Sequence, residues 1–182
     1  GDFKDPRPKA HGPLPHEHSR YKGVYLNGEK VILSYTVGDA AVLEFPSFYA
    51  KDGVDVITRS FSLNKSSAPL AMLVCEQDKA TGGIAPIGQA VTAQTSGSVD
   101  GNLAVLDIGE NCIAAGVVGA PAGTTWALTA EGAIQLKVPA LNAPARYALH
   151  VWSGPKTELS KFGAVFKGAP SPVDIEALTK GG

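Results

Sequence analysis

Residues 20–44 constrain the fold of this chain more than any other segment. Short apolar stretches alternate there with two glycine-containing dipeptides, Asn27-Gly28 and Gly38-Asp39. Asn-Gly is preferred in a type I′ hairpin turn because both central residues need a positive φ, and Gly-Asp can close the next connection in the same way. The segment therefore predicts three strands of an antiparallel β-meander joined by two tight turns.

The rest of the chain continues this pattern. The 21 glycines and 13 prolines, with little helical periodicity, favour many short strands linked by turns. Further strands are expected at 54–63, 70–75, 103–108, 113–118, 126–129, 134–138 and 146–152. We therefore predict an all-β fold, an antiparallel β-sandwich.

Two of these strands carry more specific expectations. Ile57, Phe61 and Leu63 alternate with polar residues, which predicts a half-buried strand. Residues 70–75 are apolar on both sides, which predicts an interior strand covered above and below. Residues 78–102 are rich in small and polar side chains and are expected to form a loop or edge region.

The two ends of the chain differ from the middle. Residues 1–19 contain four prolines and three histidines and predict an extended lead-in, because proline removes a backbone donor and restricts its neighbour. Residues 155–182 predict short C-terminal helices, one at 157–166 and one that Ser171 would cap ahead of Pro172 and Asp174. The sandwich domain itself is then expected at 20–154.

Charge and hydropathy exclude two classes of partner. Sixteen basic and 17 acidic side chains give a net charge of −1, without a run of like charge. Nucleic acids and anionic membrane surfaces are bound by basic patches, so neither is expected here. Apolar stretches are interrupted well before the roughly 20 residues that a membrane-spanning helix needs, so no membrane span is expected.

Three of the four histidines, His11, His16 and His18, lie within eight residues. A His-x-His pair on an extended segment directs both rings to one side, which would suit Zn or Cu. The alternative is an exposed arm that binds nothing, since only Glu17 and Asp5 lie near as further ligands.

The two cysteines, Cys75 and Cys112, have neither zinc nor redox spacing. They form either a disulfide between neighbouring strands or two buried thiols. A Cys-x-x-Cys-His motif for haem attachment is absent from the sequence, and we expect no cofactor in this segment.

Catalytic signatures are equally scarce. The sequence has no Gly-x-Ser-x-Gly elbow and no phosphate-binding loop. His150 is expected to face outward or to satisfy a local hydrogen bond, and the carboxylates, Glu44 among them, are scattered. We therefore expect a chain that is not itself an enzyme.

Aromatic side chains offer one binding hypothesis. Tyr21, Tyr25, Trp126 and Trp152 could stack on the apolar faces of sugar rings. The alternative for most of them is core packing, and Tyr35, which alternates in step with Val37, is assigned to the buried set.

Several runs resemble a known group of proteins. They are Asp5-Pro-Arg-Pro, Gly12-Pro-Leu-Pro15, Tyr21-Lys-Gly-x-Tyr25-x-x-Gly28-x-x-Val31-x-Leu-Ser34-Tyr-Thr-Val-Gly38, Val42-Leu-Glu44 and Val173-Asp-Ile-Glu-Ala-Leu-Thr-Lys-Gly-Gly182. Together they cover about a third of the chain. They resemble a β-rich segment of large secreted proteins from planctomycete- and verrucomicrobia-type bacteria. In those proteins the segment precedes a sorbosone/glucose-dehydrogenase-like β-propeller and often a c-type cytochrome domain.

This resemblance implies a location and a role. The chain would be part of a longer periplasmic or extracellular dehydrogenase, whose C-terminal helical segment leads into the propeller domain and whose redox chemistry lies elsewhere. We expect a non-catalytic module that packs on the neighbouring propeller or binds carbohydrate. The alternative is a metal-binding protein or enzyme that uses the histidine cluster.

Overall fold

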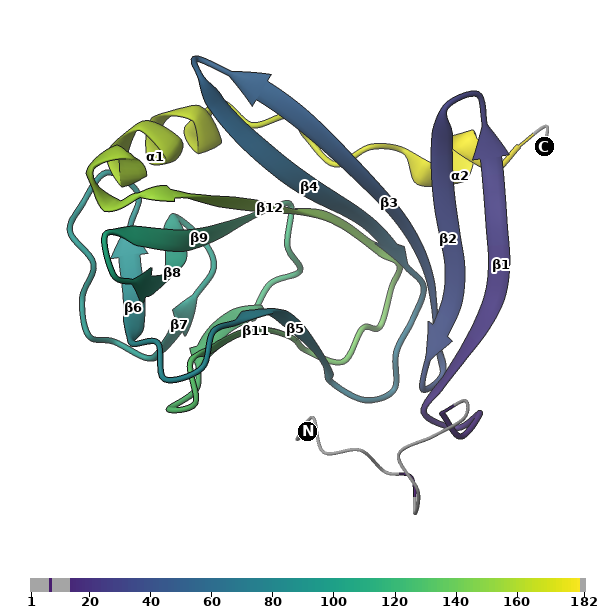
Figure 1. Ribbon diagram of the computed structural model, residues 1–182. Coiled ribbons are helices and arrows are strands. Elements are labelled where there is room, and N and C mark those ends of the chain that lie inside the picture. The colour runs from purple at the N-terminus through teal and green to yellow at the C-terminus, as the bar shows by residue number, and fades with distance from the viewer. Residues whose placement is uncertain (1–6, 8–13, 181–182) are drawn as a thin grey trace.

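Two antiparallel β-sheets of unequal width make up most of the protein. The computed structural model describes residues 7 and 14–180 (Figure 1). The larger sheet has, in spatial order, β1 (Ser19–Asn27), β2 (Lys30–Val37), β3 (Ala40–Lys51), β4 (Val54–Leu63), β12 (Ala145–Pro155), β9 (Asn111–Val118), β8 (Asn102–Ile108) and β6 (Gly82–Pro86). The smaller sheet has β5 (Leu70–Glu76), β11 (Ala133–Val138), β10 (Thr125–Leu128) and β7 (Ser96–Ser98). The predicted all-β, antiparallel sandwich is confirmed.

Short helices follow the last strand, as predicted. A 3₁₀ turn, Lys156–Glu158, leads into α1 (Leu159–Lys167), and α2 (Ile175–Leu178) follows a short extended segment. The cap of α2 differs from the prediction, because the side chain of Asp174 rather than Ser171 accepts the hydrogen bond from the Ala177 N–H. Arg146 of β12 forms ion pairs with Asp174 and Glu176 and so holds α2 against the sheet. None of the described helices is long and apolar enough to cross a membrane.

The larger sheet is covered on both faces over part of its width. We call the side that faces the smaller sheet its inner face. The core between the two sheets includes Phe61, Trp126, Leu136, Tyr147 and Leu149. A second core lies under α1 on the outer face, where its buried side chains are Val54, Val56, Ala85, Leu103, Val105, Cys112, Ala114, Trp152, Phe162, Val165 and Phe166. Strands β4 and β12 thus contribute side chains to both cores, which corrects the half-buried reading of residues 54–63.

Glycine-containing turns join the first four strands, but not all as predicted. The first hairpin pairs Asn27 with Lys30, so the central turn residues are Gly28 and Glu29 rather than Asn27 and Gly28. Of these two only Gly28 has a positive φ. The pair with positive φ at both positions, which defines a type I′ turn, is Asp52-Gly53 between β3 and β4.

Two further expectations about strands have different outcomes. β5 is not an interior strand covered above and below, since Leu73 is 37% exposed and the strand lies at one end of the smaller sheet, where it pairs only with β11. Its apolar run was misread because periodicity alone cannot distinguish a strand covered by neighbours in its own sheet from one at an edge. The edge character of residues 78–102 is confirmed, because β6 and β7 end the larger and the smaller sheet.

Substitution by alanine is expected to change the stability of the protein in opposite directions at two glycines, Gly53 and Gly163. At Gly53, φ is +72°, so Gly53→Ala should lower the free energy of unfolding by about 1 kcal/mol. Gly163 lies inside α1, and a methyl group there would meet Ile87 Cγ2 at an ordinary 3.6 Å. Gly163→Ala should therefore raise the free energy of unfolding by about 0.5 to 1 kcal/mol. Urea denaturation of both variants measures the two values, and equal signs would contradict this account.

Candidate functional site

The smaller sheet leaves part of the inner face of the larger sheet uncovered. In Figure 1, β5 and β11 lie opposite the middle of the larger sheet, whereas the β1–β2 hairpin extends beyond them. The pairing of β2 with β3 ends at Leu33 and Glu44, two residues before Pro46, which has no N–H to donate. Beyond this point the β1–β2 and β3–β4 hairpins extend separately.

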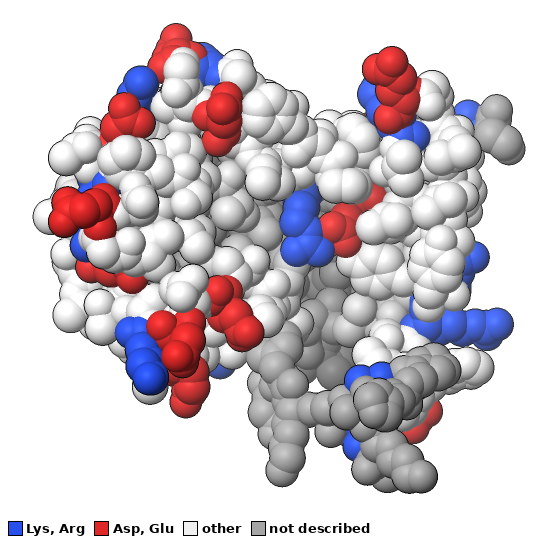
Figure 2. All heavy atoms as spheres, in the orientation of Figure 1, with Lys and Arg blue, Asp and Glu red and all other residues white. Residues whose placement is uncertain are grey.

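Large apolar side chains are exposed on this uncovered surface. Strand pairing places Tyr21 opposite Tyr35, Leu26 opposite Val31, and Phe48 opposite Ile57, all on the inner face. We call this surface the bare face; its exposed side chains are Tyr21 (68%), Val24 (46%), Leu26 (65%), Val31 (42%), Phe48 (62%) and Ile57 (58%). Figure 2 shows a hollow between the side of the molecule that carries the β1–β2 hairpin and the rest of the protein. The visible walls of this hollow are mostly uncharged.

An ion pair marks the border between the bare face and the buried core. Glu44 of β3 is 6% exposed, and its Oε1 accepts a hydrogen bond of 2.6 Å from Arg59 Nε on β4. Its Oε2 accepts a second hydrogen bond, of 2.8 Å, from the Tyr35 hydroxyl. Because the carboxylate is paired with a cation and with a neutral donor, its charge is tolerated in a nearly buried position.

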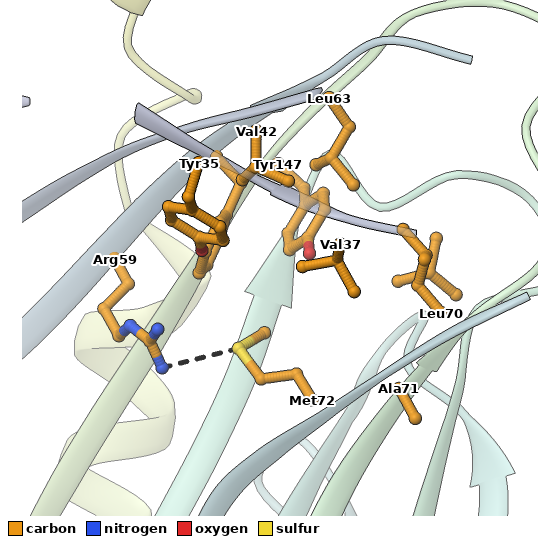
Figure 3. A pocket seen from close by; sticks show the side chains of 11 residues that line it. Tyr35, Val37, Val42, Arg59, Leu63, Leu70, Ala71, Met72 and Tyr147 are labelled. Carbon is orange, nitrogen blue, oxygen red and sulfur yellow. Dashed lines mark hydrogen bonds between the residues drawn. The ribbon is translucent and has the colours of Figure 1, made fainter. Parts of the chain in front are cut away.

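Arg59 also connects the two sheets. Its Nη1 lies 3.4 Å from Sδ of Met72 on β5, and its Cζ lies 5.1 Å from the centre of the Phe61 ring (Figure 3). About a third of the side chain, 32%, remains exposed, and Arg59 lines the cavity described next. Arg59 is therefore both the partner of Glu44 and an available donor.

A cavity of about 140 Å³ opens beside this ion pair. The hydroxyl groups of Tyr35 and Tyr147 face it from the larger sheet, and Leu70, Ala71 and Met72 of β5 line its opposite side (Figure 3). Burial raises the pKa of both tyrosines, and for Tyr35 the neighbouring Glu44 carboxylate raises it further. Both hydroxyls therefore stay neutral, and the cluster offers hydrogen bonds rather than an activated nucleophile.

The structure does not bring the four predicted sugar-stacking residues together. Trp126 is fully buried between the sheets, and Trp152 is buried against Phe162 under α1, so both follow the core-packing alternative. Tyr21 and Tyr25 are exposed on β1, but Tyr25 pairs with Ile32 and faces the outer side. Only Tyr21 lies on the bare face.

The metal hypothesis concerns residues that are only partly described. His11 lies outside the described residues, whereas His16 and His18 lie in an exposed turn before β1. The described part of the chain contains no group of three or more His, Cys, Asp or Glu side chains that could hold a metal ion. A metal site at His11, His16 and His18 stays a prediction.

The two cysteines are free thiols on opposite sides of the larger sheet. Cys75 packs against the core between the sheets, and Cys112 belongs to the core under α1. Burial raises the pKa of the Cys75 thiol to about 11, so it stays protonated at neutral pH. Of the two readings of the sequence, the structure has the free thiols, with Cys112 buried and Cys75 half-buried.

His150 is a core residue rather than a catalytic base. It is fully buried, and its Nδ1 lies 3.3 Å from Thr58 Oγ1 and 3.4 Å from the Tyr49 hydroxyl. Burial lowers the pKa of the imidazole to about 4, so the ring is neutral at pH 7. The expected local hydrogen bond is thus present.

Sequence reasoning missed the Arg59–Glu44 pair. Glu44 shares the inward direction of Val42, and Arg59 shares that of Phe61, so each is a charged residue at a core-facing position of an alternating strand. Such a pair is costly unless its members meet, because an unpaired buried charge loses its hydration. Two opposite charges at inward positions of adjacent strands were the signal that could have located this site.

Comparison with known proteins gives limited further information. Residues 1–44 of the 182 match a family described as a domain of unknown function (DUF6797). A solved heparinase III gene product with methylated lysines aligns with 76% of this chain and 21% of its own, at 15% identity and a TM-score of 0.38. This chain thus spans about a fifth of that structure, and the likeness is too weak to support an argument. No curated protein matches.

The ion pair predicts a specific pattern of coupling. Arg59→Met should lower the free energy of unfolding by about 2 kcal/mol, because it leaves the Glu44 carboxylate nearly buried without its cation. Adding Glu44→Gln should recover part of that loss, and Lys65→Met, at an exposed cation, serves as the control. Denaturant titrations of the unsubstituted chain, the two single variants Arg59→Met and Glu44→Gln, the double variant and the control measure the coupling, and additive losses would show that the pair is not an energetic unit.

Proposed function

We propose that this chain is a non-catalytic β-sandwich module that docks through its bare face onto a neighbouring domain of a longer polypeptide. The observation that carries the proposal is the set of exposed apolar side chains that the β1–β2 and β3–β4 hairpins present on the inner face. Soluble monomers rarely expose large contiguous apolar patches, and such patches mark interaction sites. The candidate site adds hydrogen-bonding groups but no nucleophile or catalytic base.

The chemistry of the bare face fits a protein partner. Val24, Leu26, Val31 and Ile57 are aliphatic, and aliphatic side chains bury area against another apolar surface. The charges of the pair at its border neutralise each other, so a partner needs no counter-charge there and only has to offer hydrogen-bond acceptors to Arg59. Phe48 is the one phenylalanine of the bare face, and its exposed ring is a suitable anchor for a partner.

The identity of the partner rests on the sequence resemblance alone. We propose that it is the β-propeller of a sugar-oxidising dehydrogenase, and that the polypeptide works in the periplasm or outside the cell. The module itself needs no cofactor in this proposal. The alternative of a metal-binding protein or enzyme that uses His11, His16 and His18 rests on their spacing alone.

Docking predicts a large effect of charge on the bare face. The 182-residue chain and the polypeptide that flanks it in its gene can be expressed separately and titrated by calorimetry. The double variant Phe48→Asp/Ile57→Asp should weaken binding at least about tenfold, because two buried apolar contacts are replaced by desolvated charges. Val91→Asp, at a side chain of 39% exposure in a loop, should leave binding unchanged.

Circular dichroism would check that both variants fold. Equal affinity of the double variant and the unsubstituted chain would exclude the bare face as the docking surface. Loss of binding in both variants would point to a general effect of added negative charge instead.

A second candidate function is carbohydrate binding, which the polar groups at the cavity favour. Arg59 has free N–H groups, and the Tyr35 and Tyr147 hydroxyls face the same cavity of about 140 Å³. Such convergent donors and acceptors suit the hydroxyl groups of a sugar at the end of a chain. Tyr21, on the same face, would be available for stacking.

Sugar binding can be separated from docking. On a glycan array, the unsubstituted chain should bind a glycan that Arg59→Met fails to bind, because the substitution removes the cavity's charged donors. Phe48→Asp should leave that signal in place, since Phe48 does not line the cavity. An array without a hit would leave docking as the sole proposed function.

A further inference from the structure

The free edges of the two sheets are protected unequally. Of the four edge strands described, β1 carries Arg20 and Lys22 and a bulge between Tyr21 and Gly23. β6 contains two glycines and Pro86, and β7 has only three residues. Charges, bulges, proline and shortness are the usual devices that keep an edge strand from pairing with another chain.

β5 has little of this protection. Its sequence from Leu70 to Cys75 is apolar, uncharged and contains no proline. Its one irregularity lies between Leu73 and Cys75, beyond the residues that line the cavity. Every second peptide group of an edge strand points away from its sheet, so β5 presents free donors and acceptors along one side.

The free edge of β5 lies next to the bare face. Leu70, Ala71 and Met72 line the same cavity as Tyr35 and Val37 of β2. Leu70 and Met72 face the core but are only half-buried, so the described residues leave part of both side chains open to solvent. One more strand, about 4.8 Å beyond β5 and about 10 Å from the larger sheet, would lie over the inner face of β2 and β3.

We infer that the free edge of β5 is a strand-addition site, which accepts an extended peptide segment with apolar side chains at alternate positions. The added segment supplies the strand that the smaller sheet lacks, and its inward side chains cover the bare face. This inference rests on the proposed docking function and specifies the partner's contribution, a single extended segment of polypeptide.

A second copy of this chain does not fit as the occupant. Symmetric antiparallel pairing of two β5 strands places both smaller sheets in one layer and both larger sheets in the other. The larger sheet already extends past β5 in its layer, where β1–β4 lie, so the partner's larger sheet would occupy the same space. The overhang leaves room for a lone strand.

Alternate backbone methylation tests the inference directly. The probe is a fluorescein-labelled, acetylated peptide amide, Lys-Thr-Val-Thr-Val-Thr-Val-Lys, in which valines can face the bare face and threonines the solvent. Two control peptides carry N-methyl groups on the valines only or on the threonines only. In a strand these two sets of N–H groups point to opposite sides, and only one set can pair with β5.

Fluorescence anisotropy with the 182-residue chain should show binding of the unmethylated peptide. One methylated peptide should bind at least about tenfold more weakly, because it loses several interstrand hydrogen bonds, and the other should bind nearly as well. Amide shifts in two-dimensional NMR should be largest for residues 70–76. Shifts centred on 19–27 would place the peptide at β1 and overturn the assignment.

The remaining outcomes separate this inference from the docking proposal. If both methylated peptides bind like the parent and Phe48→Asp abolishes binding, the bare face docks side chains without strand addition. If one methylated peptide fails and Phe48→Asp has no effect, strand addition stands and the bare face is not the docking surface. Absence of binding by all three peptides would overturn strand addition.

Discussion

The structure depends on one constraint, that a sheet of four strands packs on a sheet of eight. Where the two overlap, side chains such as Trp126 and Leu149 are fully buried, and the fold obtains its main core there. Where they do not overlap, every second side chain of the larger sheet still points to the inner face, but there it is exposed to solvent. The bare face, the half-buried β5 and the open cavity are three consequences of this mismatch in width.

Much of the fold could be predicted because turn chemistry and alternation are local. Gly38-Asp39 closes the second hairpin as expected, and the strands from 103 to 152 lie close to the expected ranges. The neighbours of a strand within its sheet are set by contacts between residues far apart in the chain. The alternation of apolar and polar residues along one strand does not indicate which strands these neighbours are. Residues 70–75 therefore read as interior, although β5 is an edge. The first turn was misplaced by one residue because Asn27-Gly28 specifies a turn but not its register.

The candidate site was less predictable, for a physical reason. Stacking was considered for Trp126 and Trp152 because aromatic faces pack on sugar rings, but the same apolar rings also favour burial, and both are buried. Glu44 was counted among the scattered carboxylates and Arg59 was not considered, although each lies on the inward side of its strand. The informative residues are those whose polarity conflicts with their position, since a charge retained at a core-facing position requires a partner.

The position of the ion pair bears on how the bare face could select a partner. While the face is open, Arg59 is one-third exposed and keeps part of its hydration. A partner that covers the face buries the guanidinium, and this loss of hydration lowers affinity unless new hydrogen bonds replace the water. An apolar surface alone would accept many partners. The Arg59 guanidinium needs hydrogen-bond acceptors when it is buried, so partners without suitable acceptors are disfavoured. In the proposed interface, the Arg59–Glu44 pair would therefore lower the affinity for every partner but would lower it most for partners without suitable acceptors. An aliphatic pair at the same position would raise affinity without this discrimination between partners.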